Sequence, residues 1–208
     1  MADTTEYLTR IRDYAQGKDP LELQKQTPAV LAQMVAKASD EQLTRRPSKD
    51  KWSIGEILAH LAEDEIATAW RYRQMVEHTG IQLAGFDQDL WARMGDYASR
   101  APHESLVLFR LLRNANLQFL QHIIPEQWEC FGIHGERGRI TVRDLAVHMA
   151  GHDANHIEQI RRNSRMTRAH LQARVCTAAN SLVLRADCNC FGSHRASMQG
   201  NRLAVPSE

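Results

Sequence analysis

The sequence predicts an all-α protein built around a four-helix bundle. Four segments of helical length carry apolar residues at the spacing of one helix face, and residues that start or stop helices flank them. One long connection joins the second and third of these segments, as a bundle with a crossed connection requires. The chain has 208 residues, which is enough for one domain with a sizeable core. The four helices are expected at about residues 21–38, 54–78, 103–122 and 141–162.

A short helix is expected at about residues 5–15, ahead of the bundle. It ends at residues 17–20, where Gly-Lys-Asp-Pro is a turn signal. The polar segment 40–51 carries Pro47 and is expected to be a connection. The helix between them has an apolar face supplied largely by Ala29, Leu31, Ala32, Met34, Val35 and Ala38.

Capping signals support the start and the end of the helix over 54–78. Ser53 is a good N-cap, and Glu56 three residues later completes the capping-box pattern. Gly80 lies just beyond the helix, where helices often stop. The long connection then covers residues 79–100, with one short helix expected at about residues 87–94.

Prolines delimit the helix over 103–122, and glycines mark the segment after it. Pro102 opens this helix and Pro125 follows its end. Glycines at 132, 135 and 138 indicate a turn-rich stretch that could hold two short strands or a loop. The helix over 141–162 follows.

The composition changes after this last helix. From Asn163 onward there are six arginines against two acidic residues, with scattered Ser, Asn and Cys. We therefore expect a bundle domain over residues 5–163 and a tail over residues 164–208 that is disordered or loosely attached.

Charge and hydropathy argue against several function classes. The formal net charge is +1, which gives no general case for nucleic acid or a membrane surface as partner. No run approaches the ~20 apolar residues of a membrane span, and the first residues lack a signal-peptide pattern. Cys130 is the only cysteine in the expected bundle, which fits a reducing compartment. A cytoplasmic location is therefore expected.

Two histidines interrupt the apolar face of the last helix. His152 and His156 fall in the middle of the stripe formed by Leu145, Met149 and Ile160. Burying an imidazole without a partner costs roughly 1–3 kcal/mol, so both residues need an explanation. A pair at i and i+4 is the spacing with which one helix gives two nitrogens to one metal ion.

His148 extends this pair to a ladder of three. It lies at the edge of the stripe and is interpreted as a neighbour of the site or a surface residue. A ligand pair of His148 with His152 stays open.

The helix over 54–78 has polar residues on and beside its own apolar face. Glu65 lies near the centre of that face, and His60 and Asp64 lie on its flank. A buried carboxylate needs a cation or strong hydrogen bonds, which a facing metal site or a protonated histidine would supply. The alternative is that these residues are ordinary core polar groups with satisfied hydrogen bonds.

Two sequence motifs resemble a known family. Residues 51–65 read KWSIGEILAHLAEDE and resemble the first histidine motif of the DinB superfamily. Residues 151–160 read GHDANHIEQI and resemble its second motif, which carries a histidine pair. Segments 17–20, 27–28 and 86–91 are also similar, and the resemblance covers about residues 5–163.

The resemblance implies both a topology and a metal site. The implied fold is a four-helix bundle in up-down-down-up order, and the family's three ligands map onto His60, His152 and His156. The metal would be a divalent ion, usually nickel or zinc. Relatives include transferases that use bacillithiol or mycothiol and a maleylpyruvate isomerase, while many members have no known activity. A small-molecule substrate is therefore expected, with a low-molecular-weight thiol as cosubstrate.

Three chemical functions are compatible with such a site. Three neutral imidazoles leave a divalent ion with open positions, where a bound thiol would become a thiolate for S-transfer or a water would be activated for hydrolysis. Asp64 or Glu65 could orient a ligand histidine or act as a base. The third function is a non-catalytic bundle that binds a metal or a small ligand, or that mainly dimerises. Bundles of this type often form homodimers, and no stripe in the sequence decides that point.

Overall fold

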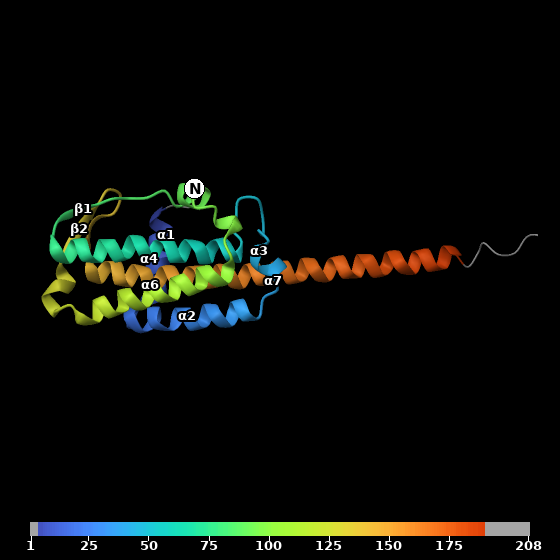
Figure 1. Ribbon diagram of the computed structural model, residues 1–208, viewed down its shortest axis with the longest axis horizontal. Helices are drawn as coiled ribbons and strands as arrows, with labels where there is room; N and C mark the ends of the chain where they lie inside the picture. The colour runs from blue at the N-terminus through green and yellow to red at the C-terminus, as the bar shows by residue number, and fades with distance from the viewer. Residues whose placement is uncertain (1–3, 190–208) are drawn as a thin grey trace, which may run out of the picture. The chain divides into compact units, whose positions relative to one another are not determined.

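Four helices form the bundle: α2 (Pro20–Ala36), α4 (Ile54–Glu77), α6 (Pro102–His122) and α7 (Val142–Asn189). This computed structural model describes residues 4–189, with side chains described for residues 6–167. The helices α2 and α7 run in one direction and α4 and α6 in the other (Figure 1). The order along the chain is therefore up-down-down-up, which confirms the predicted fold. The chain divides into two units, residues 1–168 and 169–208, and the bundle belongs to the first.

The predicted helix starts are built as the sequence indicates. Ser53 Oγ accepts a hydrogen bond from the Glu56 amide at 3.2 Å, and the Glu56 carboxylate accepts one from the Ser53 amide at 2.8 Å. This reciprocal capping box satisfies two backbone donors that the first turn of α4 would otherwise leave free. The Asp19 side chain caps α2 by accepting hydrogen bonds from the Leu21 and Glu22 amides. Pro102 occupies the first turn of α6.

Shorter helices flank the bundle. The structure has α1 at Thr4–Ala15, α5 at Gln88–Met94, and 3₁₀ turns η1 at Tyr97–Ser99 and η2 at Pro125–Glu129. The helices α1 and α5 match the two short helices predicted from the sequence. The helix α3 (Asp40–Thr44) lies in the segment predicted to be a connection. It is only five residues long, so it has no periodicity to reveal it.

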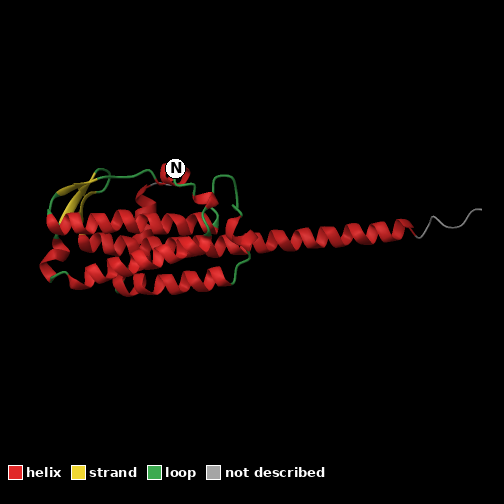
Figure 2. Ribbon diagram, viewed as in Figure 1, coloured by secondary structure: helices red, strands yellow, loops and turns green. Residues whose placement is uncertain are grey.

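A small sheet packs alongside the C-terminal end of α4 (Figure 2). Strand β1 (Ile81–Leu83) pairs in parallel with β2 (Phe131–His134), which pairs antiparallel with β3 (Gly138–Thr141). The strands β2 and β3 lie in the glycine-rich stretch, for which the sequence left two short strands or a loop open, whereas β1 was not predicted. Gly132 is required at its place, because a Cβ there would lie 2.5 Å from the side chain of Leu83.

The interior has two hydrophobic clusters with polar side chains between them. One cluster is built around Leu31, Leu58 and Phe109, and the other around Tyr72 and Leu145. Each bundle helix carries buried polar residues in or next to the stretch between its contributions to the two clusters. We call these residues the polar layer; its members are Gln24, Thr27, His60, Asp64, Glu65, Thr68, Arg113, Asn116, His152, Asp153 and His156.

The guanidinium of Arg113 is the centre of the polar layer. Its Nη1 donates to Asp153 at 2.5 Å, and its Nη2 donates to Glu65 at 2.7 Å. Nη1 also donates to the backbone carbonyl of Gln24 at 3.1 Å. Since these partners lie on α7, α4 and α2, one side chain of α6 contacts the other three bundle helices.

The last helix extends further than the sequence predicted. Its end was expected at residue 162, but α7 continues to Asn189. Residues 163–189 contain no glycine and no proline, so no breaker ends the helix. Residues 190–208 lie outside the described residues, and the loose attachment of the tail over 164–208 stays a prediction. None of the described helices contains an apolar stretch that could span a membrane.

Removing the Arg113 charge should destabilise the bundle. The substitution Arg113→Met leaves Glu65 and Asp153 buried without their cation, so we expect the free energy of unfolding to fall by about 3–5 kcal/mol. Arg143→Met is the matched control, because Arg143 pairs with Glu129 on the surface, where both side chains are more than half exposed. That change should cost at most about 1 kcal/mol. Urea denaturation measures both values, and equal losses would contradict a special role for Arg113.

Candidate metal centre

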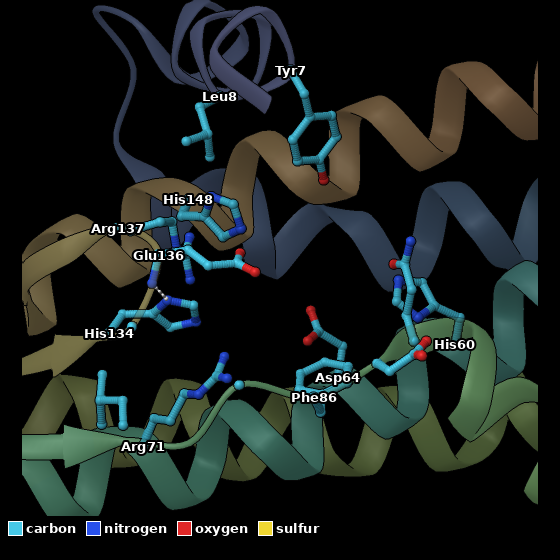
Figure 3. Close-up of a pocket in the computed structure, with 15 residues that line it drawn as sticks. Tyr7, Leu8, His60, Asp64, Arg71, Phe86, His134, Glu136, Arg137 and His148 are labelled. Atoms are coloured by element: carbon cyan, nitrogen blue, oxygen red, sulfur yellow. Dashed lines mark hydrogen bonds between the residues drawn. The ribbon is translucent and has the colours of Figure 1, made fainter. Parts of the chain in front are cut away.

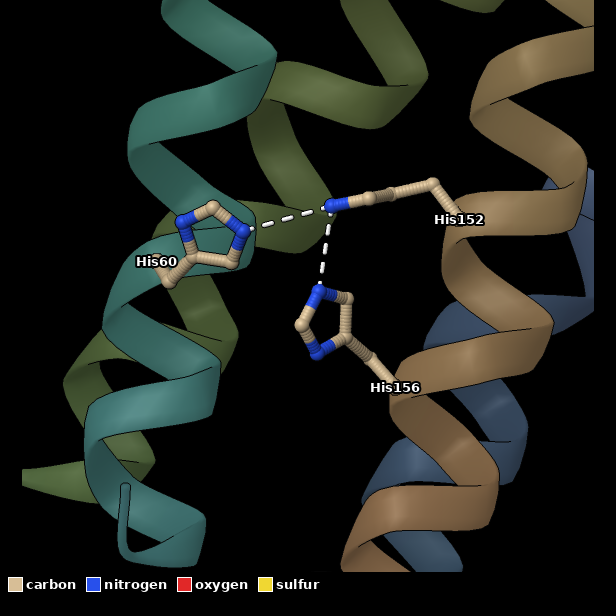
Figure 4. A group of neighbouring side chains, drawn as sticks. All are labelled: His60, His152 and His156. Carbon is tan, nitrogen blue, oxygen red and sulfur yellow. Dashed lines mark hydrogen bonds between the residues drawn. The ribbon is translucent and has the colours of Figure 1, made fainter. Parts of the chain in front are cut away.

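Three imidazoles converge inside the bundle (Figure 4). His60 comes from α4, and His152 and His156 come from successive turns of α7. The Nε2 atom of His152 lies 3.2 Å from that of His60 and 3.0 Å from that of His156. All three side chains are buried, and one ring nitrogen from each lies within 4.8 Å of the others. The structure thus brings together the three histidines that the sequence singled out.

The spacing of these nitrogens fits a tetrahedral metal site. Zinc binds imidazole nitrogen at about 2.0–2.1 Å, so neighbouring ligands around a tetrahedral ion lie about 3.3–3.4 Å apart. The two Nε2 separations given above are within a few tenths of an ångström of that value. Imidazole ligands suit zinc, nickel, copper and iron, which makes these the ions that the donor set can hold.

Neighbouring groups fix the orientation of two of the rings. His156 Nδ1 lies 2.8 Å from the amide oxygen of Gln159, a contact that requires a proton on Nδ1 and leaves the Nε2 lone pair free. His152 Nδ1 has no hydrogen-bond partner, but the carboxylate of Asp64 is 3.6 Å away. A small movement would make Asp64 an acceptor for His152, as metal-binding histidines usually have.

Burial keeps these imidazoles in the form that binds metal. Desolvation lowers the pKa of His156 to about 4, and it lowers the pKa of His60 and of His152 well below the ordinary value. Neighbouring histidines lower the pKa of His60 and His152 further, because each would repel a second positive charge. All three rings are therefore neutral at pH 7 in the metal-free protein.

The two predicted carboxylates lie in different surroundings. Asp64 lines a cavity together with His60, and burial followed by the charge of Glu65 raises the pKa of Asp64 to about 7. Glu65 points instead toward α6, where it accepts hydrogen bonds from Arg113 and from the Asn116 amide at 2.8 Å. Asp64 is thus beside the histidines, whereas Glu65 belongs to the Arg113 ion pairs.

His148 lies outside the group of three. Its ring stacks on that of His152 with 6.1 Å between ring centroids, and it lines the same cavity as His60. In the part of the chain that the structure describes, His60, His152 and His156 form the one group of histidine, cysteine or acidic side chains that could hold a metal ion.

Two cavities are each lined by one of the three histidines. The first has a volume of about 740 Å³ and is lined by His60 and Asp64 (Figure 3). The second has a volume of about 620 Å³ and is lined by Trp52, His156 and Gln159. Tyr7 of α1 lines both cavities, so α1 forms a wall common to the two.

Several residues around the site were not predicted. Arg113 and Asn116 have a sequence signal, because they occupy the buried face of α6 between Phe109 and Leu120. An arginine on a largely apolar helix face indicates a buried ion pair, so this signal could have identified Arg113 as a member of one. The residues of the first cavity that no local pattern indicates are Tyr7, Leu8, Arg71, His134, Glu136 and Arg137.

Comparisons with known proteins place the chain among related sequences. The sequence model of the DinB superfamily matches residues 24–160. Bacillus subtilis "Putative metal-dependent hydrolase YfiT" is 23% identical over 162 residues, 77% of this chain and 91% of that protein. "Putative metal-dependent hydrolase OB0413" of Oceanobacillus iheyensis is 22% identical over 134 residues, 63% of this chain and 75% of that protein.

A solved structure shares the fold. The structure of YfiT from Bacillus subtilis, described as having "an unusual four-helix bundle topology", superposes with a TM-score of 0.67 at 21% identity. The superposition covers 71% of this chain and 85% of that chain.

Metal binding should depend on three histidines and not on the fourth. We expect near-stoichiometric zinc or nickel in protein supplied with the ion, measured by elemental analysis after desalting. His60→Ala, His152→Ala and His156→Ala should each weaken binding by more than about 100-fold, since even outer partners of a metal site contribute 10–100-fold. His148→Ala is the control and should retain the metal. Equal losses in all four variants would contradict the ligand assignment.

The metal-free protein should lose stability in acid partly through His156. Its imidazole takes up a proton near the ordinary pKa when unfolded but only near pH 4 when folded. The unfolded chain therefore binds more protons between about pH 6.5 and pH 4, and stability falls as the pH falls through that range. Asp64 acts in the opposite direction, because its raised pKa lets the folded state take up a proton first.

Comparison with His156→Gln isolates the contribution of His156. Measured with a chelator present, wild-type stability should fall relative to the variant by up to about 1.4 kcal/mol per pH unit below pH 6.5. Above that pH the difference between the two proteins should be constant. A difference that does not change with pH would show that His156 is protonated equally in both states.

Proposed function

This chain belongs to the DinB superfamily, and on that premise we propose that it is a metal-dependent hydrolase whose divalent ion is held by His60, His152 and His156. The observation that carries the proposal is the convergence of three buried, neutral imidazoles, of which that of His60 lines a cavity. Both curated relatives carry the name "Putative metal-dependent hydrolase", which supports hydrolysis over the thiol transfer that the sequence resemblance placed first. Zinc and nickel are the proposed ions.

The chain supplies both the ligands and a proton acceptor. A divalent ion with three imidazole ligands keeps an open coordination position and lowers the pKa of a water molecule held there. The Asp64 carboxyl lies at the cavity wall beside His60, within reach of His152. Burial raises the pKa of Asp64 to about 7 in the metal-free protein, and a bound cation would lower it, so the carboxylate is the form available to accept a proton at neutral pH. We assign Asp64 the role of taking the proton from the attacking water.

Transfer to a thiol is the second candidate, and the second cavity favours it. A hydrolase needs room for one organic substrate, whereas a transferase must hold an electrophile and a thiol together. His60 lines one cavity and His156 lines the other, so two substrates could meet at the three histidines. The thiol would be a small molecule of the bacillithiol or mycothiol type. In that reaction Asp64 would accept the thiol proton.

Activity assays on metal-loaded protein separate these functions. Turnover of activated esters and amides without thiol supports hydrolysis, whereas turnover of a small electrophile only with added thiol supports transfer. Asp64→Asn should lower kcat by about 10²–10⁴-fold while the metal content is retained. Glu129→Gln removes a carboxylate that is mostly exposed and is the matched control. A metal-loaded protein that turns over neither class would favour the non-catalytic binding bundle.

A further inference from the structure

The larger cavity has two chemically different ends (Figure 3). His60 and Asp64 lie at one end, where the proposed metal site is. Arg71, His134 and Arg137 lie at the other end, and His148 lies beside them. These side chains come from α4, from β2 and the turn after it, and from α7, so only the folded structure brings them together.

Arg71 is a buried cation without an ion-pair partner. Its side chain is 8% exposed, and no carboxylate of the described residues lies within ion-pair distance. One N–H donates to the carbonyl oxygen of Ala84 at 2.7 Å, and the guanidinium lies over the ring of Phe86. These two contacts hold the planar group in place and leave most of its five donors directed at the cavity. A buried charge without a counter-ion is costly, so its retention needs an explanation.

Arg137 brings a second guanidinium to the same end of the cavity. It lies in the turn between β2 and β3 and likewise has no ion-pair partner among the described residues. Burial and then the charge of Arg71 lower the pKa of Arg137, which places two like charges near each other in a partly dry space. An anion between them would relieve both the repulsion and the lost hydration.

His134 adds a neutral donor to the pair of arginines. The backbone N–H of Glu136 donates to His134 Nδ1 at 3.2 Å. Because Nδ1 accepts, the ring proton of neutral His134 is on Nε2, where it is available to a ligand. Burial lowers the pKa of His134, so the neutral ring is the form expected at pH 7.

The acidic residues of the cavity do not cancel this arrangement. Asp64 lies beside His60, and its charge acts on Arg71 and Arg137 across the cavity, but it forms no ion pair with either. Asp87 also lines the cavity. Glu136 is the carboxylate next to Arg137, yet it forms no ion pair with either arginine. The two guanidiniums thus remain free to bind an anion from outside the chain.

We propose that Arg71, Arg137 and His134 form a subsite for an oxyanion group of the substrate, a carboxylate or a phosphate. The substrate would be a small organic anion, with its charged end at the arginines and its reacting bond near His60 and Asp64. The proposal deepens the proposed function and rests on it for the identity of the reacting end. Arg71 and Arg137 would bind the anionic group of the substrate. The three histidines would hold the metal ion at the reacting end of the same molecule.

Direct binding tests the subsite without requiring turnover. The probes are succinate and inorganic phosphate, with succinamide as the uncharged match, measured by calorimetry on the full chain. We expect at least one of the two anions to bind with a Kd of about 1 mM or tighter, and succinamide not to bind. Binding of phosphate but not succinate would assign the subsite to phosphate, and the reverse to carboxylate.

Variants locate the bound anion. Arg71→Gln and Arg137→Gln should each weaken binding by about 10-fold or more, because each removes charged hydrogen bonds. Arg143→Gln removes a surface arginine and should leave the Kd unchanged. Arg137 lies in a turn, so its variant keeps the test valid even if Arg71→Gln fails to fold.

A metal-site variant distinguishes failure of this proposal from failure of the proposed function. In His152→Ala the arginine subsite should still bind the anion, whether or not the protein is a metal-dependent enzyme. Binding lost in His152→Ala but kept in both arginine variants would place the anion at the metal and overturn the subsite. Absence of binding by either anion to the wild-type protein would overturn it as well.

Discussion

The bundle depends on the buried ion pairs of Arg113. A guanidinium that is 1% exposed must have its charge balanced and its donors satisfied, or the folded state becomes unstable. Asp153 of α7, Glu65 of α4 and the Gln24 carbonyl of α2 balance the charge and accept hydrogen bonds from both Nη atoms, whereas Nε has no hydrogen-bond partner. These three groups can all contact Arg113 in only one register of the helices. The ion pairs therefore determine how the four helices align along their lengths.

This alignment positions the candidate metal site. Glu65 follows Asp64 directly in the sequence, and Asp153 follows His152. A helix that is held at Glu65 therefore also positions Asp64, and one that is held at Asp153 also positions His152. When Arg113 binds both carboxylates, α4 and α7 are held at the register in which the imidazoles of His60 and His152 meet. The hydrophobic clusters on either side stabilise the fold, and the polar layer between them favours this one alignment of the helices.

The bundle helices and the segments that connect them contribute different parts of the candidate site. The ligand histidines project from long helices, which hold them rigidly. The cavity walls come largely from α1, from the connection around Phe86 and from the turn between β2 and β3. A change in those segments would alter which molecule fits without moving the metal site. This division is consistent with a bundle that superposes on YfiT at only 21% identity.

The sequence by itself determined what depends on neighbours along the chain. Periodicity and caps located the bundle helices, and the i, i+4 spacing placed His152 and His156 on one buried face. The resemblance to the DinB superfamily pointed to His60 as their partner, but only the tertiary structure placed His60 Nε2 3.2 Å from His152 Nε2. A helical wheel shows that Glu65 is buried but not that its cation is Arg113, 48 residues away. The extension of α7 was readable in part, since residues 163–189 contain no glycine and no proline. Strand β1 and the placement of Arg71 and Arg137 in one cavity were inaccessible, because each is decided by contacts between distant segments, which periodicity does not report.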